Sequence, residues 1–256
     1  MTVYRTPGLR GLELWHGIAR GATLYQLRDS KAEYFQALTE FLIRLQRGEA
    51  EADDKEDTHG LLKAAGFQRV VFCGGDAAHP LLSAALVSAA LPFTYRIEEG
   101  AYAGRRGALR IFEEMNWRRG VALDLGQWRL KVMTPEGDFS VLRDESLLPF
   151  GRDAIDHALG RERVRNMLRD VLERAGPPDG VVLALPVAID DSGFARSSTY
   201  PGLFGPVAPL FAELFSTPWF VLNDAVLAAR GFQPHPHEKL LVVTLGFGVG
   251  GALWTP

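Results

Sequence analysis

The chain has 256 residues, of which 47% are hydrophobic and 23% are charged, as in a globular protein with an ample core. The formal net charge of −3 argues against a nucleic-acid partner, and no apolar run reaches the roughly 20 residues that span a membrane. The single cysteine, Cys73, excludes an internal disulfide, and the first residues lack the apolar segment of a signal peptide, so we expect a cytoplasmic location.

In chain order, the first part of the sequence predicts a short strand at residues 2–5 and then a long helix. Four apolar residues lie on one stripe of that helix: Phe35, Leu38, Leu42 and Leu45. The acidic stretch at 49–57 is predicted to be a solvated loop. The pattern continues with a strand at 69–75, a helix at 80–90, a strand at 93–97 and a helix near 105–115.

The middle of the chain predicts a second set of strands and helices. Its elements are three strands at 120–126, 128–134 and 138–144, a helix with Val164, Leu168, Val171 and Leu172 on one face, a strand at 181–186, a helix at 207–215 and a strand at 219–223. This order of three strands, helix, strand, helix and strand resembles a ribonuclease-H-like domain.

The same order appears a second time if the two ends of the chain are taken together. Residues 239–246 and 248–254 supply two strands, and residues 2–5 are predicted to be the third strand beside them. We therefore predict an α/β protein with two such domains, circularly permuted, so that the glycine-rich turn near the C-terminus lies inside a sheet. The predicted domains are residues 117–223 and residues 1–116 with 224–256.

Several motifs make the chain similar to the ROK sugar kinases, which belong to the superfamily of actin, sugar kinases and heat-shock ATPases. In the family's cyclic order these blocks are LDLGQWRLKV (123–132), LPVAIDDSG (185–193), LNDAVLAARG (222–231), GFGVGG (246–251), ELWH (13–16), VVFCGGDA (70–77) and RRGALRIF (105–112). The resemblance implies an actin-like ATPase fold, ATP with Mg²⁺ as cofactors and a small-molecule sugar as substrate. Family members are often dimers, so it also allows a homodimer.

The candidate catalytic residue is Asp224, which follows a predicted strand and opens a helix. We interpret it as a general base that takes the proton of a sugar hydroxyl, with a purely structural N-cap as the alternative. Asn223 offers a donor and an acceptor for two neighbouring sugar hydroxyls. Glu13 and His16, three residues apart, are candidates for contacts with the same sugar, and the alternative is that both are ordinary surface residues.

The candidate cofactor site combines one carboxylate with several glycines. Asp124, just before Gly126, is predicted to hold Mg²⁺ through water. Backbone N–H groups in the second glycine motif are predicted to bind phosphate, or alternatively its glycines only shape a hairpin: Gly246, Gly248, Gly250 and Gly251. Gly74 and Gly75 would let adenine lie against the backbone.

Two phosphate-loop positions depart from the family pattern. Trp128 and Phe247 stand where the family has threonine, and Gln127 replaces a glycine. A ring donates no hydrogen bond to phosphate and fills space, although Arg129 or Lys131 could compensate. Three functions therefore stay open: an ATP-dependent sugar kinase, a kinase-like protein that binds sugar or nucleotide without turnover, or another acyl or phosphoryl transferase on this scaffold.

Overall fold

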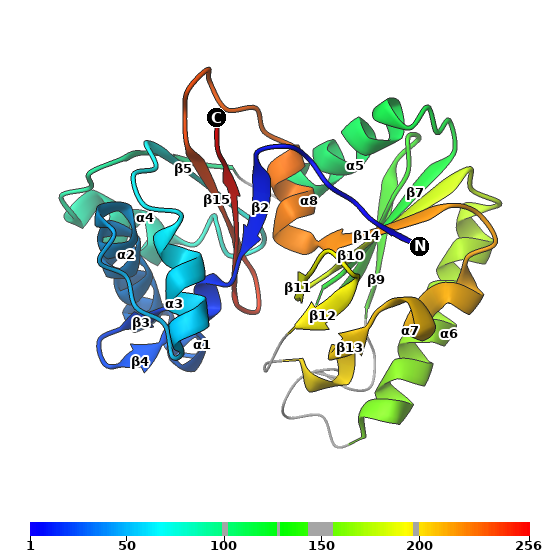
Figure 1. Cartoon of the computed structure of the whole chain (residues 1–256), viewed down its shortest axis with the longest axis horizontal. Helices are drawn as coiled ribbons and strands as arrows, with labels where there is room; N and C mark the ends of the chain where they lie inside the picture. The colour runs from blue at the N-terminus through cyan, green and yellow to red at the C-terminus, as the bar shows by residue number, and fades with distance from the viewer. Residues whose placement is uncertain (99–101, 127–128, 143–155, 197–199) are drawn as a thin grey trace. The chain divides into compact units, whose positions relative to one another are not determined.

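The computed structural model describes residues 1–98, 102–126, 129–142, 156–196 and 200–256. It is a mixed α/β structure, as the sequence predicts. The chain forms two compact units (Figure 1). The first unit comprises Met1–Arg5 and Gly104–Leu227, and the second unit comprises Thr6–Ala103 and Ala228–Pro256.

The first unit is built on a six-stranded sheet with the order β1-β14-β10-β7-β8-β9. Its strands are β1 (Thr2–Val3), β7 (Gly120–Leu125), β8 (Arg129–Met133), β9 (Asp138–Leu142), β10 (Gly180–Leu185) and β14 (Trp219–Asn223). Strands β7, β8 and β9 form an antiparallel meander, whereas β10, β14 and β1 run parallel to β7. The carboxyl ends of β7, β10 and β14 therefore lie at the same edge of the sheet.

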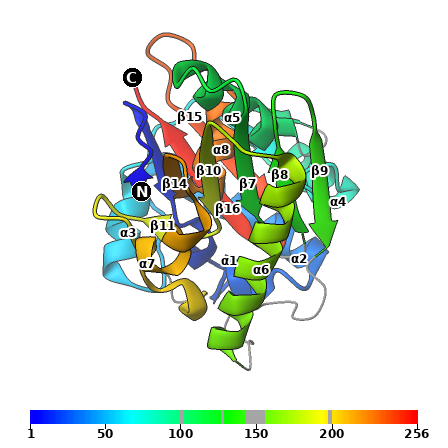
Figure 2. The same cartoon turned by 90° about the vertical axis from the view of Figure 1, so that its right-hand side faces the viewer.

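Helices cover both faces of this sheet, which explains why β7 and β10 are buried along their whole length. On one face, α6 (His157–Ala175) packs against the odd-numbered residues of β7, and Figure 2 shows this helix in front of the sheet. On the other face, α5 (Tyr102–Glu114) packs against the even-numbered residues, together with Leu227 of α8 (Asp224–Arg230). Strand alternation thus separates two apolar cores.

The remaining elements of the first unit follow β10 along the chain. They are β11 (Ala188–Ile189), β12 (Phe194–Arg196), η2 (Pro201–Leu203), β13 (Gly205–Pro206), α7 (Ala208–Phe211) and η3 (Ala212–Leu214). The short strands β11, β12 and β13 form a small antiparallel sheet. The helix predicted over 207–215 is therefore a short α-helix that continues as a 3-10 turn.

The second unit is built on a five-stranded sheet with the order β2-β16-β15-β5-β6. Its strands are β2 (Leu9–Leu12), β5 (Arg69–Cys73), β6 (Thr94–Ile97), β15 (Leu240–Leu245) and β16 (Val249–Trp254). Strands β15, β16 and β2 form an antiparallel meander, and β5 and β6 run parallel to β15. These directions repeat those of β7, β8, β9, β10 and β14 in the first unit.

Helix α2 (Lys31–Arg47) supplies most of the helical core of the second unit. Its stripe of Phe35, Leu38, Leu42 and Leu45 is fully buried, so this part of the sequence prediction is confirmed. The other elements are η1 (Leu14–His16), β3 (Ile18–Ala19), β4 (Ala22–Thr23), α1 (Leu24–Leu27), α3 (Lys55–Leu62) and α4 (Pro80–Ser88). Within the described residues, every helix is too short or too polar to cross a membrane.

The prediction for residues 2–5 is wrong. Thr2 and Val3 pair with β14 of the first unit, and the strand beside β16 is β2, in which Arg10 is opposite Leu253. The β-branched and aromatic residues at 2–5 favour a strand by propensity, but propensity does not select the partner. The backbone turns at Gly8, whose φ is +74°, and the N–H of Thr255 donates to its carbonyl at 2.7 Å.

The acidic stretch at 49–57 is also not a solvated loop throughout. Helix α3 begins at Lys55, and the side chain of Asp54 accepts a hydrogen bond from the N–H of Asp57 as an N-cap. Acidic side chains in the first turn favour a helix because they face its unpaired N–H groups. The stretch predicted to be a solvated loop thus contains the start of a helix.

Candidate functional site

A carboxylate and an ammonium group face each other near the carboxyl end of β7. Asp124 lies directly opposite Lys131 of β8, and Nζ of Lys131 donates to Oδ2 of Asp124 at 2.9 Å. Only 12% of the Asp124 side chain is exposed, against 39% for Lys131. Lysine therefore balances the charge of a carboxylate that has little access to water.

Strand alternation determines which face carries this pair. Ala122 and Met133, two residues from Asp124 and Lys131 respectively, belong to the core on the α5 side of the sheet. Asp124 and Lys131 therefore point to that same side. Arg129 has the same parity, but its Nη1 donates to Oγ of Ser140 at 3.2 Å.

The chain turns from β14 into α8 at Asn223 and Asp224. Oδ1 of Asn223 accepts from the N–H groups of Ala225 and Val226, at 3.0 and 3.3 Å, and Nδ2 donates to the carbonyl of Val187 at 3.1 Å. Asn223 is thus the residue that caps α8. Most of its hydrogen-bonding groups serve the fold, which leaves one N–H of the amide for a ligand.

The carboxylate of Asp224 has a different role from the cap. It is the first residue of α8, and its Oδ1 accepts only from the adjacent N–H of Ala225, at 2.7 Å, among the hydrogen bonds to the described residues. Burial is the main cause that raises the pKa of Asp224 to about 7, and the negative charge of Asp124 acts in the same direction. The N–H of Ala225 and the charge of Lys131 act in the opposite direction. A carboxyl group that titrates near neutral pH is suited to take up and release a proton.

These three side chains form what we call the acidic site: Asp124, Lys131 and Asp224. They lie at the edge where the parallel strands β7, β10 and β14 end, which is the usual place for ligands in an open α/β sheet. Oδ1 of Asp124 accepts no hydrogen bond from the described residues, so a carboxylate oxygen is available to a hydrated Mg²⁺. The donor set thus fits the predicted cation.

The nearby phosphate motif is only partly described. Gly126 donates its N–H to the carbonyl of Asp124 at 3.0 Å, which bends the chain directly after β7. Gln127 and Trp128, whose replacement of glycine and threonine the sequence singled out, lie outside the described residues.

In the second unit, the predicted phosphate loop is the hairpin between β15 and β16. Leu245 and Val249 are its last strand pair, so Gly246, Phe247 and Gly248 form the turn. A Cβ atom at Gly246 or Gly248 would have no neighbour within 4 Å among the described residues, apart from the adjacent residues of the chain. The turn therefore leaves open space beside its backbone, as a loop that approaches a ligand requires.

The other predicted cofactor glycines have different surroundings. Gly251 packs against Leu14, because a Cβ atom at position 251 would lie 2.6 Å from the side chain of Leu14. Gly250 of β16 lies opposite Thr244 of β15. Gly74 has a φ of +101° and lies against the backbone of Leu245, where a Cβ would come within 2.2 Å of the carbonyl oxygen. A Cβ atom at Gly75 would have no neighbour within 4 Å among the described residues, apart from the adjacent residues of the chain. Packing therefore requires glycine at positions 74 and 251 and does not require it at position 75.

We predict that alanine at Gly251 and at Gly246 will have opposite consequences. Gly251→Ala should lower the free energy of unfolding by about 1 to 3 kcal/mol because the new methyl group clashes with Leu14. Gly246→Ala should leave it unchanged or raise it by less than about 1 kcal/mol. Urea denaturation of both variants tests this, and an equal loss at both positions would show that the turn is as tightly packed as the strand.

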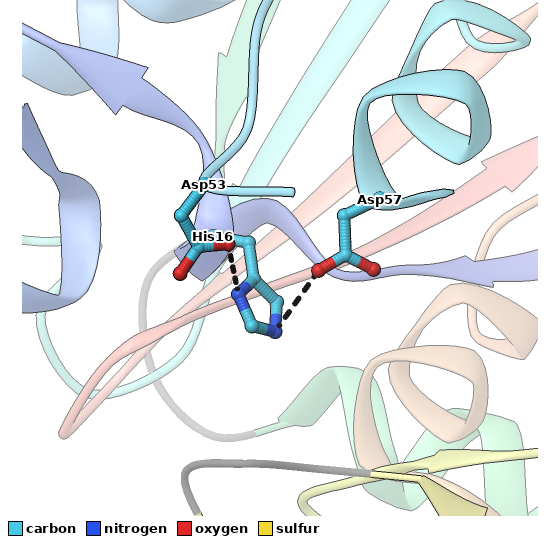
Figure 3. A group of neighbouring side chains, drawn as sticks. All are labelled: His16, Asp53 and Asp57. Atoms are coloured by element: carbon cyan, nitrogen blue, oxygen red, sulfur yellow. Dashed lines mark hydrogen bonds and ion pairs between the residues drawn. The ribbon is translucent and has the colours of Figure 1, made fainter. Parts of the chain in front are cut away.

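A second cluster of charged side chains surrounds His16 (Figure 3). Nδ1 of His16 lies 2.7 Å from Oδ1 of Asp53, and Nε2 lies 3.3 Å from Oδ2 of Asp57. His16 ends η1 and is 8% exposed, and Glu13 immediately precedes η1. The interpretation of His16 as an ordinary surface residue is therefore wrong.

The His16 cluster places two carboxylates against one imidazole ring. Burial raises the pKa of Asp57, and the nearby His16 lowers it. Both ring nitrogens of His16 face carboxylate oxygens, so the ring is held from two sides. Nitrogen and oxygen atoms of all three residues lie within 4.8 Å of one another, so a divalent cation is a possible occupant.

Sequence reasoning missed Lys131 as the partner of Asp124, and it missed Asp53 and Asp57 altogether. Lys131 could be placed only once the register of β8 against β7 was known. A signal for Asp57 existed in the helix-start pattern after Asp54. No protein-family model matches this chain, and no curated protein does either.

Proposed function

We propose that this protein is an ATP-dependent sugar kinase of the ROK type, in which the two units are circularly permuted ribonuclease-H-like domains of an actin-like ATPase fold. The strand directions support the fold part of the proposal, because both sheets combine an antiparallel meander with strands parallel to its first strand: β10, β14 and β1 in one sheet, β5 and β6 in the other. The hydrogen bond from the N–H of Thr255 to the carbonyl of Gly8 supports the permutation. It joins the residue after β16 to the residue before β2, so the two strands are neighbours as a continuous hairpin would make them.

The acidic site carries the functional proposal. It combines a carboxyl group whose pKa is about 7, Asp224, with a second carboxylate that a lysine holds in place, at the carboxyl edge of a parallel sheet. Two neighbouring acids with different environments are the arrangement that divides base and cation-binding roles. A purely structural cap does not account for Asp224, because Asn223 already caps α8.

In the proposed reaction, Asp224 accepts the proton of a sugar hydroxyl as its oxygen forms a bond to the γ-phosphorus of ATP. The bond between this phosphorus and the bridging oxygen breaks, and ADP leaves with the electron pair. Asp124 would hold Mg²⁺, which neutralises charge on the phosphates when bound. Lys131 holds Asp124 in place by a hydrogen bond, and its positive charge limits the rise in the pKa of Asp224. The remaining N–H of the Asn223 amide is the proposed sugar contact in the first unit, whereas both ring nitrogens of His16 face carboxylates of its own unit.

The second candidate function is binding of sugar or nucleotide without turnover. The observation that favours it is Phe247, the middle residue of the turn, which has a ring in contact with Tyr25 where the family carries a hydroxyl. A bulky ring in this position would disturb the alignment of the phosphates that phosphoryl transfer needs.

A screen of hexoses and amino sugars with Mg²⁺ and ATP separates the two functions. The kinase proposal expects ADP and a sugar phosphate in equal amounts from at least one sugar, whereas the binding proposal expects thermal stabilisation by a ligand with no product. A ligand at 100 times its Kd should stabilise by about 2.7 kcal/mol. The proposal fails if no sugar is phosphorylated by the wild type or by Phe247→Thr.

A further inference from the structure

An arginine of the second unit lies against the glycine turn. The guanidinium carbon of Arg28 is 3.9 Å from the centre of the Tyr25 ring and 5.0 Å from the centre of the Phe247 ring. The two rings meet edge to face, with 6.5 Å between their centres. Arg28 follows α1 along the chain, so a residue of the predicted phosphate loop and a cation from a distant segment come together here.

The guanidinium of Arg28 has unused donors. Its only hydrogen bond to the described part of the chain runs from Nη1 to the carbonyl of Tyr25, at 2.8 Å. Nε is buried without a hydrogen-bond partner, and the nearest carboxylate oxygen, on the exposed Asp29, is 3.8 Å away. Only 15% of the side chain is exposed, so water satisfies few of these donors.

The backbone beside Arg28 also has donor capacity. Gly246 donates to the carbonyl of Gly248 at 3.1 Å, whereas the N–H of Gly248 has no acceptor among the described residues. Apart from their direct chain neighbours, no described residue has an atom within 4 Å of a Cβ position at Gly246 or Gly248. An anion that approaches this turn therefore meets an N–H group, open space and a nearby positive charge.

We propose that Arg28 and the turn of Gly246, Phe247 and Gly248 bind the phosphate groups of a polyphosphate anion. The inference rests on the proposed function, because it concerns the same predicted phosphate loop, and it assigns Phe247 a role in that loop. Phe247 lacks the hydroxyl of the family's threonine, which could donate one hydrogen bond. Its ring instead contacts the guanidinium of Arg28, which can donate several hydrogen bonds and carries a full charge. Phe247 is then a support for the binding cation.

The competing explanation is that Arg28 only packs between two rings. A packing role needs the flat guanidinium and its alkyl stem, but it needs no free donors and no open turn. It predicts that changes at Arg28 alter stability and leave anion binding untouched. Binding and stability must therefore be measured on the same variants.

The test is calorimetric titration of the full chain with inorganic tripolyphosphate at low and at moderate salt. We expect binding that weakens with salt, and a loss of about 10- to 100-fold in affinity for Arg28→Gln, because a charged hydrogen-bond donor disappears. Arg28→Lys should retain part of the affinity, since it keeps the charge without the planar fork. Arg47→Gln, which removes the same charge from an exposed position at the end of α2, is the matched control and should bind as the wild type does.

Circular dichroism and thermal melts show whether each variant is folded. Absence of tripolyphosphate binding by the folded wild type, or equal affinity of Arg28→Gln and wild type, overturns the inference. If Arg28→Gln unfolds, Arg28→Lys decides, because an affinity equal to that of the wild type would contradict the role of the planar guanidinium.

The outcomes separate this inference from the kinase proposal. Tripolyphosphate binding that depends on Arg28, in a protein that phosphorylates no sugar, supports the anion site and removes the kinase. Sugar phosphorylation with the same KM for ATP in Arg28→Gln and wild type supports the kinase and removes the anion site.

Discussion

Replacement of Asp224 by asparagine should lower the turnover of the sugar kinase reaction by about 10²- to 10⁴-fold, the contribution of a general base. The amide keeps the shape of the side chain and an oxygen that can accept from the N–H of Ala225, but it cannot take the proton of the sugar hydroxyl. Sugar affinity should change little, so kcat falls while KM stays nearly constant. Steady-state kinetics with the sugar identified in the screen measures both.

The pH dependence provides an independent check of the same variant. The base must be ionised to act, so kcat/KM of the wild type should rise with pH through the pKa of Asp224, about 7. The residual activity of Asp224→Asn should lack this rise. Asp190→Asn is the matched control, because Asp190 is a carboxylate of the first unit outside the acidic site. Equal kcat values for wild type and Asp224→Asn would remove Asp224 from the mechanism.

The sequence predicted best where burial is continuous. Residues 181–186 and 239–246 are almost wholly apolar, and the structure makes them the buried strands β10 and β15. The stripe on α2 is equally clear, because burial of one helix face imposes a strict spacing. Such segments are predictable because one local pattern and one global environment agree.

The sequence predicted poorly where the partner of a segment decides its structure. Residues 2–5 have strand propensity, but only tertiary contacts place Thr2 and Val3 beside β14 while Leu9–Leu12 pairs with β16. In the same way, the face of the sheet on which Lys131 lies follows from the register of β8 against β7. Local patterns describe a strand and leave its neighbours open.

The candidate site shows the same limit at the level of single side chains. The sequence identified Asp124, Asn223 and Asp224 because each lies at the end of an apolar strand or directly after it. It could not assign the helix cap to Asn223. Asp53 is 37 residues from His16 along the chain, and no spacing rule relates them. Contacts of this kind follow from the fold and are absent from any short motif.

Asp224 should also make the stability of the protein depend on pH. Its pKa is about 7 in the folded protein against an ordinary value of 3.8, so between these pH values the folded state retains a proton that the unfolded chain has lost. The free energy of unfolding should therefore fall as pH rises from 4 to 7 and then level off. Asp224→Asn removes this dependence, and its advantage over the wild type should grow by about 2 kcal/mol between pH 5 and pH 8.

Urea denaturation at pH 5, 6, 7 and 8 measures this difference, and Asp190→Asn provides a control of the opposite sign. Hydrogen bonds from Ser192 and from the N–H of Phe194 lower the pKa of Asp190 to about 2. Its carboxylate therefore stabilises the folded state above the unfolded pKa, and this stabilisation is lost as pH falls through the folded value. Asp190→Asn should be less stable than the wild type at pH 7, where Asp224→Asn is more stable. A constant difference in the free energy of unfolding between Asp224→Asn and wild type across the pH series would mean that Asp224 is ionised throughout. Asp224 would then lack the titration near neutral pH on which its role as a base depends.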